Sequence, residues 1–198
     1  MTKPIIYTAL LLLPLMGLTQ EKPITVKSKT EGFFGIIYLD YYNYSSVEQE
    51  LFFSNTFTRE KLDPRKSFGT NLNFMAGYFL IAHRLSLAGG VGLYRGFSRD
   101  IFGTPLINGN LRFYFTDEKN TLFCYMNIGG TKKMSFNNLG GIFKMGLGHK
   151  FHLTKKLLVS ADISFVISGY SLTKERYRNS SWVIRSQGVG LSVGFYIF

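Results

Sequence analysis

Cysteine is almost absent from this chain of 198 residues, and proline and acidic residues are scarce. The one cysteine, Cys124, excludes an intramolecular disulfide framework and a zinc site built from several thiolates. The 12 acidic residues stand against 23 Lys and Arg, which gives a formal net charge of +11. Charged residues make up only 18% of the chain, whereas soluble domains usually contain about 25%. This composition is unusual for a protein whose whole surface meets water.

Long apolar runs are also scarce, and the one such run lies at the N-terminus. It extends from Ile5 to Leu18, follows Lys3, and ends beside the small residues Gly17 and Thr19. This is the pattern of a cleavable secretory signal peptide, here residues 1–19, and the run is shorter than the roughly 20 apolar residues of a membrane-spanning helix. We therefore expect export through the general secretory pathway and one domain at 20–198 that is not a helical membrane protein.

Strand-like alternation of apolar and polar residues dominates the rest of the chain. Hydrophobic residues make up 45%, aromatic residues 16%, and there are 21 glycines. Alternation with a period of two predicts half-buried strands. The clearest block is 157–168, and the facing of the first block is open because it is apolar on both faces. Eight strands are predicted, at 32–44, 68–80, 85–96, 105–116, 121–130, 138–150, 157–168 and 182–198.

The connections between these blocks alternate in length. Longer or more polar joins are predicted at 45–67, 97–104, 131–137 and 169–181, and tight ones at 81–84, 117–120 and 151–156. Outer-membrane barrels have short periplasmic turns and longer external loops. The pattern therefore predicts an all-β fold, an eight-stranded antiparallel up-and-down transmembrane β-barrel.

The two faces of the strands indicate which side meets lipid. One face carries Leu, Ile, Val and Phe, and the other carries Gly, Ser and Asn with few charges, which suits a crowded lumen better than a solvated surface. The alternative is a soluble periplasmic barrel that binds a ligand in an apolar interior. Aromatic residues near the strand ends predict interfacial girdles; in the first block these are Tyr38, Tyr41, Tyr42 and Tyr44.

Three charged residues fall on the predicted lumen face: Arg112, Lys144 and Asp162. Lys144 and Asp162 lie at equal distances from the turn near residue 153, so a regular hairpin would place them opposite each other. We expect a charge network that fills the lumen and sets the strand register. A proton or ion path is the alternative, although a barrel of about eight strands has room only for its own side chains.

From about Gln20 to Phe198 the chain resembles the small Gram-negative outer-membrane β-barrel superfamily of the OmpX/OmpA-barrel type. The signal peptide, the eight alternating blocks and the final Gly194-Phe195-Tyr196-Ile197-Phe198 carry the resemblance. Tyr196 and Phe198 look like the terminal aromatic signal that the barrel-insertion machinery reads. The resemblance implies an outer-membrane location.

Three functions are compatible with such a barrel. The first is a structural or interaction role through the external loops: envelope integrity, adhesion, or an accessory part of a secretion or assembly system. The second is a narrow channel or a conduit for small or apolar ligands. The third is a lipid-modifying enzyme, which needs a Ser–His pair near the outer rim. His83, His149 and His152 are all predicted at the inner end, so we expect no catalytic residues, no cofactor and no metal.

The partners follow from the location and from the basic residues of the external joins. Lys132, Lys133, Lys174, Arg176 and Arg178 are predicted to meet outer-membrane lipid, as contacts to lipopolysaccharide phosphates. The longest join, 45–67, is the predicted contact for an extracellular or envelope protein. Nucleic acid is not expected, because the chain is exported and its basic residues are scattered.

Overall fold

The computed structural model describes residues 32–53, 56–63, 68–82, 84–96, 104–118, 120–133, 138–154, 157–173 and 180–197. The predicted signal peptide therefore lies outside the described residues. No helix within the described ranges is long and apolar enough to cross a membrane. The strands are β1 (Phe33–Phe53), β2 (Thr56–Leu62), β3 (Phe68–Ile81), β4 (Leu85–Arg95), β5 (Thr104–Tyr114), β6 (Thr121–Lys133), β7 (Asn138–His152), β8 (Leu158–Thr173) and β9 (Ser180–Ile197).

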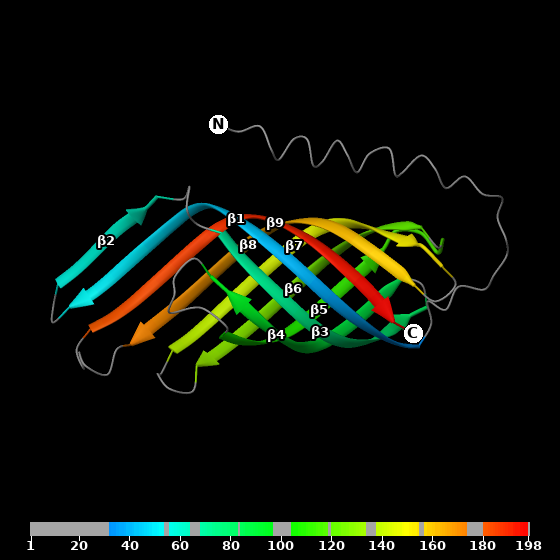
Figure 1. Cartoon of the computed structure of the whole chain (residues 1–198), viewed down its shortest axis with the longest axis horizontal. Helices are drawn as coiled ribbons and strands as arrows, with labels where there is room; N and C mark the ends of the chain where they lie inside the picture. The colour runs from blue at the N-terminus through cyan, green and yellow to red at the C-terminus, as the bar shows by residue number, and fades with distance from the viewer. Residues whose placement is uncertain are drawn as a thin grey trace.

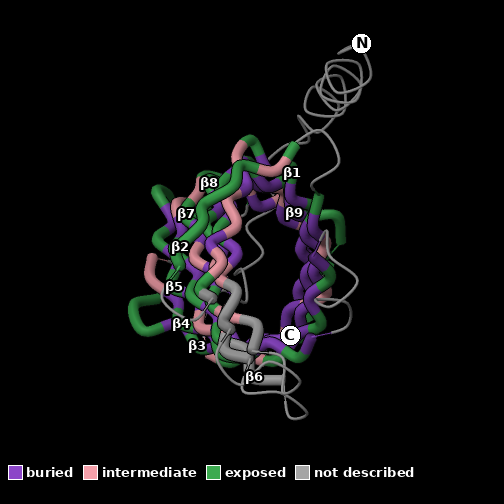
Figure 2. Tube along the Cα trace, turned by 90° about the vertical axis from the view of Figure 1, so that its left-hand side faces the viewer, coloured by how far each residue is buried: buried purple, intermediate pink, exposed green. Residues whose placement is uncertain are grey.

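The strands form one antiparallel sheet that closes on itself (Figure 1). Each strand from β3 to β8 pairs with the next, and β1 pairs with both β3 and β9. Eight strands thus make the wall, in sequence order, and β2 is an addition at the edge. Seen almost along its axis, the trace forms a closed ring in which buried and exposed positions alternate (Figure 2). The predicted eight-stranded up-and-down barrel is confirmed.

The predicted facing of the strands is confirmed as well. In β8, Ile163, Phe165 and Ile167 point outward and are exposed, whereas Asp162, Ser164 and Ser168 point into the barrel and are buried. The outward side is apolar around the wall; Ile107, for example, leaves 73% of its surface exposed. Large apolar side chains on the outside and Ser, Asn and charged side chains on the inside are the reverse of a soluble barrel.

Several strands are longer at the outer end than the sequence predicted. The segment expected as an external join at 45–67 instead continues β1 to Phe53 and returns as β2. Likewise, β6 runs to Lys133 and β8 to Thr173, where joins at 131–137 and 169–181 were predicted. Backbone hydrogen bonds of an antiparallel pair need no apolar side chain. The end of the apolar alternation therefore marks the end of the apolar outer belt and not the end of the strand.

The longer strands build a sheet that projects beyond the barrel wall, which we call the outer extension. It consists of residues 47–53 of β1, strand β2, and residues 180–186 of β9. β1 lies between β2 and β9 there, at the left of Figure 1. The extension begins just after a shift in the β1–β9 register between Tyr44 and Ser46. The shift reverses which residues of β1 face inward, because facing alternates along a strand.

A glycine at this register shift allows the two strands to approach closely. A Cβ atom on Gly188 would collide with the carbonyl oxygen of Asn43 and lie 2.6 Å from the Cα atom of Tyr44. Both atoms belong to backbone, which cannot move aside as a side chain can. We expect Gly188→Ala to lower the free energy of unfolding by about 1–3 kcal/mol, measured by urea unfolding in detergent micelles. The control is Gly169→Ala on β8, where nothing lies within 4 Å of the added carbon. Equal stability of the two variants would contradict this close approach.

Candidate functional site

The barrel interior is filled by side chains in two stacked apolar layers with polar groups between them. Aromatic rings dominate the inner layer, and four tyrosines belong to the outer layer; Tyr and Phe are large enough to reach across a narrow lumen. The inner layer contains Phe34, Ile36, Tyr38, Met75, Phe79, Ala88, Tyr114, Phe123, Tyr125, Leu158 and Tyr196. The outer layer contains Tyr42, Tyr44, Val47, Tyr94, Leu106, Ile142, Val166, Tyr170 and Ile184.

A buried ion pair crosses the lumen between Asp40 of β1 and Lys144 of β7. The Lys144 Nζ atom donates to Asp40 Oδ1 at 2.9 Å, and both residues are only 4% exposed. The other carboxylate oxygen, Oδ2, accepts hydrogen bonds from the Tyr42 hydroxyl at 2.9 Å, from Asn71 Nδ2 at 3.1 Å and from Asn73 Nδ2 at 2.9 Å. A buried carboxylate is tolerated only when its charge is paired and its oxygens accept hydrogen bonds. Asp40 meets both conditions.

The predicted contact between Lys144 and Asp162 is wrong, although both residues lie in the lumen. Lys144 is opposite Val166, and Asp162 is opposite Gly148, because β7 continues through His152 and moves the turn along the chain. Asp162 instead accepts a hydrogen bond from the Tyr125 hydroxyl at 2.6 Å. Lys144 finds its carboxylate on the far side of the barrel, which hairpin geometry alone does not predict.

Arg112, the third predicted lumen charge, is buried among aromatic rings. Its Nε atom donates to Asn110 Oδ1 at 2.7 Å, and its Nη1 atom donates to the Tyr196 hydroxyl. Its Cζ atom lies 4.7 Å from the centre of the Tyr38 ring and 5.2 Å from that of Phe123. Cation–π contacts of this kind stabilise a desolvated guanidinium. The three predicted charges therefore occupy the interior, but they do not form one contiguous network of direct bonds.

The first strand holds several residues whose placement differs from the prediction or was not predicted. Tyr38, Tyr42 and Tyr44 point into the lumen, and of the four predicted girdle tyrosines only Tyr41 points outward. Asp40 lies in the same inward row and was overlooked. The sequence does contain a signal for this row. Three tyrosine hydroxyls and one carboxylate occupy successive even positions of the first block, so one of its two hydrophobic faces also carries polar groups with a period of two.

The remaining predicted site residues have varied placements. Tyr196 points inward rather than to lipid and is 1% exposed, whereas Phe198 lies outside the described residues. Lys132 and Lys133 belong to the end of β6, and Lys174, Arg176 and Arg178 lie outside the described residues. His149 and His152 lie at the inner end of β7 as predicted, and His83 is not described. Within the described ranges, no three His, Cys, Asp or Glu side chains gather to hold a metal.

The outward face of the outer extension carries a row of ion pairs. Arg59 of β2 contacts Glu48 and lies 3.9 Å from Glu50 of β1, measured from Nε to Oε1. On the other side of β1, the Arg185 Nη2 atom of β9 lies 3.4 Å from Glu50 Oε2. The hydrogen bond from Arg59 lowers the pKa of the Glu48 carboxyl. Nearer the tip, the rings of Phe52 and Phe57 pack with centroids 5.1 Å apart.

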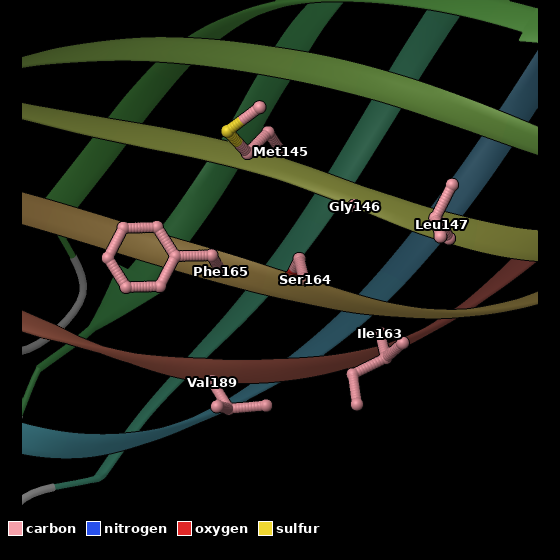
Figure 3. A pocket seen from close by; sticks show the side chains of 7 residues that line it. All are labelled: Met145, Gly146, Leu147, Ile163, Ser164, Phe165 and Val189. Carbon is pink, nitrogen blue, oxygen red and sulfur yellow. The ribbon is translucent and has the colours of Figure 1, made fainter.

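The barrel exterior has a shallow, apolar depression (Figure 3). Its volume is about 320 Å³, and its floor is formed by Gly146 and Ser164. The walls are the outward side chains of Met145, Leu147, Ile163, Phe165 and Val189. No charged side chain lines it, so it continues the apolar outer surface, whereas the charged chemistry of the wall lies inside. The chain is a barrel whose interior holds aromatic, polar and charged side chains and whose exterior is apolar.

Known proteins resemble this chain in fold and not in sequence. No protein-family model and no curated protein matches it. Among solved structures, the outer membrane protein OprG from Pseudomonas aeruginosa is 9% identical, with a TM-score of 0.49 and coverage of 87% of this chain and 99% of OprG. The N-terminal β-barrel domain of OprF from the same organism is 15% identical, with a TM-score of 0.42 and coverage of 84% and 98%.

A third solved structure is Neisserial surface protein A, which is 13% identical, with a TM-score of 0.35 and coverage of 81% of this chain and 99% of that protein. At these identities the likeness concerns the fold alone. The closed wall of eight antiparallel strands agrees with the small-barrel fold that the sequence resembles.

Proposed function

We propose that this protein is an integral outer-membrane β-barrel that anchors an extracellular sheet for interaction with a partner. The observation that carries the proposal is the reversed distribution of polarity across a closed wall. Asp40, Lys144, Arg112 and Asp162 are buried inside, while the outward positions of the wall are apolar. Closure pairs the backbone groups of every wall strand, as hydrocarbon requires.

The height of the apolar exterior supports insertion in a membrane. On β9 the outward residues are apolar from Val189 to Ile197 and become polar at Gln187 and Arg185. A tilted strand needs about 9–11 residues to cross a bilayer, and this span is of that order. The soluble alternative, a barrel with a ligand in an apolar interior, would place these side chains inside.

The filled interior favours an anchoring role over transport or catalysis. Rings from both layers and the Asp40–Lys144 pair occupy the lumen. In the described interior, bulky side chains therefore fill the space through which a solute would have to pass. The features that reach beyond the lipid belt are in the outer extension. The proposed partners are accordingly outer-membrane lipid, lipopolysaccharide and a protein that binds the extension, with no catalytic step.

The experiment is labelling of Cys124 by a water-soluble maleimide in protein reconstituted in lipid vesicles. Cys124 points outward on β6, opposite Phe113 of β5 and Leu147 of β7. We expect almost no labelling in the folded protein, because hydrocarbon excludes the reagent and disfavours the thiolate, and full labelling after denaturation. The control variant is Cys124→Ser with Ser45→Cys, which moves the thiol to an exposed position beside the outer extension and should label rapidly. Fast labelling of Cys124 in intact vesicles would overturn the proposal.

A further inference from the structure

Strand β2 has one unpaired edge in the described part of the chain. One of its edges pairs with residues 47–53 of β1, and no described strand pairs with the other. Almost all of β2 is exposed, including Phe57 at 56%. A free strand edge presents N–H and C=O groups that an extended segment of another chain can pair with. The edge is thus a surface able to accept one more strand.

The side chains beside this edge indicate what the added strand would carry. Across the outward face of the outer extension, charges alternate from strand to strand. Arg185 of β9 comes first, Glu48 and Glu50 of β1 follow, and Arg59 and Lys61 of β2 come last. Cross-strand neighbours of opposite charge stabilise a sheet, and like charges destabilise it. Arg59 and Lys61 have carboxylates on one side only, namely those of β1, so acidic residues on an added strand would continue the alternation.

We propose that the free edge of β2 binds an extended acidic segment of a partner protein, paired antiparallel as an additional strand. Read from its N-terminus, the segment has an acidic residue opposite Lys61, a second acidic residue opposite Arg59, and an aromatic or apolar residue opposite Phe57. Each of these is two positions from the next. This inference rests on the proposed function, because only an inserted barrel presents the outer extension to the cell exterior.

A second copy of this chain fits the edge less well. In a symmetric antiparallel pairing of two β2 strands centred on Arg59, this residue would lie opposite its own copy. Moving the register so that Arg59 faces Lys61 of the other copy juxtaposes cations again and places Glu60 against Glu60. Like charges directly opposite destabilise the pair. An acidic partner avoids both conflicts.

The test measures binding of a short fluorescent peptide, Thr-Glu-Thr-Glu-Thr-Tyr-Thr, to the full-length protein in nanodiscs by fluorescence polarisation. One control peptide has both Glu replaced by Lys, and another has Pro in place of the Thr between the two Glu residues, which removes a backbone donor. We expect the acidic peptide to bind more tightly than either. Lys61→Gln should weaken its binding roughly 2- to 5-fold, in line with one cross-strand charge pair, while Arg185→Gln, away from the edge, should have less effect.

The inference would be overturned if the lysine peptide or the proline peptide bound as tightly as the acidic peptide. The charges of β2 would then act only to block pairing. Equal effects of Lys61→Gln and Arg185→Gln would place the peptide elsewhere. If the protein formed a dimer without peptide, and if Lys61→Gln altered that dimer, a second copy of this chain would be the favoured occupant of the edge. Cys124 labelling in the same preparation separates the two proposals: protection of Cys124 without peptide binding leaves the membrane anchor intact and removes this inference.

Discussion

Asp40→Asn is expected to lower the free energy of unfolding by about 3–5 kcal/mol. The variant retains the shape of the side chain but leaves the Lys144 ammonium, which is only 4% exposed, without its carboxylate. The variant also keeps only one of the two oxygens that accept hydrogen bonds from Lys144, Tyr42, Asn71 and Asn73. The measurement is equilibrium unfolding in urea with the barrel refolded in detergent micelles.

A double-mutant cycle separates the loss of the pair from the loss of either side chain. Asp40→Asn with Lys144→Met removes both charges and should cost less than Asp40→Asn alone, since no buried ammonium remains. The matched control cycle combines Asp162→Asn with Lys144→Met, because Asp162 is also buried but bonds to Tyr125. Its coupling should be the smaller of the two. Additive losses in the Asp40 cycle would show that the cross-lumen pair does not form.

Val193→Arg is expected to destabilise the inserted barrel by about 2–4 kcal/mol, the cost of a cation at the bilayer midplane. Val193 points outward on β9, at the middle of the apolar span from Val189 to Ile197. A guanidinium there must either lose its hydration or distort the lipid around it. Urea unfolding in lipid vesicles, rather than in micelles, measures this effect.

Gln187→Arg is the control for that prediction. Gln187 faces outward on the same strand but beyond the apolar span, beside Ser45, whose hydroxyl donates to the Gln187 carbonyl oxygen. Near the interface the same cation costs about 0–1 kcal/mol. The difference between the two losses of unfolding free energy therefore reports how deep each position lies in the bilayer. Equal losses at both positions would contradict the assigned membrane belt.

Alternation along a single strand was predictable from the sequence, and it was sufficient for the fold. Leu, Ile and Phe at odd positions of 157–168 stand against Ser and Asp at even ones, so facing follows directly from the period of two. The facing of the first strand was not predictable in this way, because its inward row is itself aromatic. Tyr38, Tyr42 and Tyr44 present their rings to the core. Their hydroxyls bond to other lumen residues, as in the 2.6 Å contact between the Tyr44 and Tyr94 hydroxyls, so hydropathy does not separate the two faces.

The partners across the lumen were not predictable in the same way. Lys144 and Asp40 are 104 residues apart in the chain, and they meet because the wall closes and both side chains reach the same depth. Such a contact depends on the stagger of all the strands between β1 and β7. The outer extension was missed for a different reason: it is held by backbone pairing and ion pairs, which leave no apolar pattern in the residues from Glu48 to Lys61.

The pairing of β1 with β9 also determines when the barrel can form. These two strands are the first and last of the wall, and they pair from Gly35–Ile197 to Phe53–Ser180, the most extensive contact between any two strands described. Contacts between segments so distant in sequence form late, because the loop they close is long. Until β9 has been made, β1 has a bare edge that could pair with the wrong chain. We therefore expect closure of the wall to be a late step of folding, and a chain waiting for it needs protection from aggregation in the meantime.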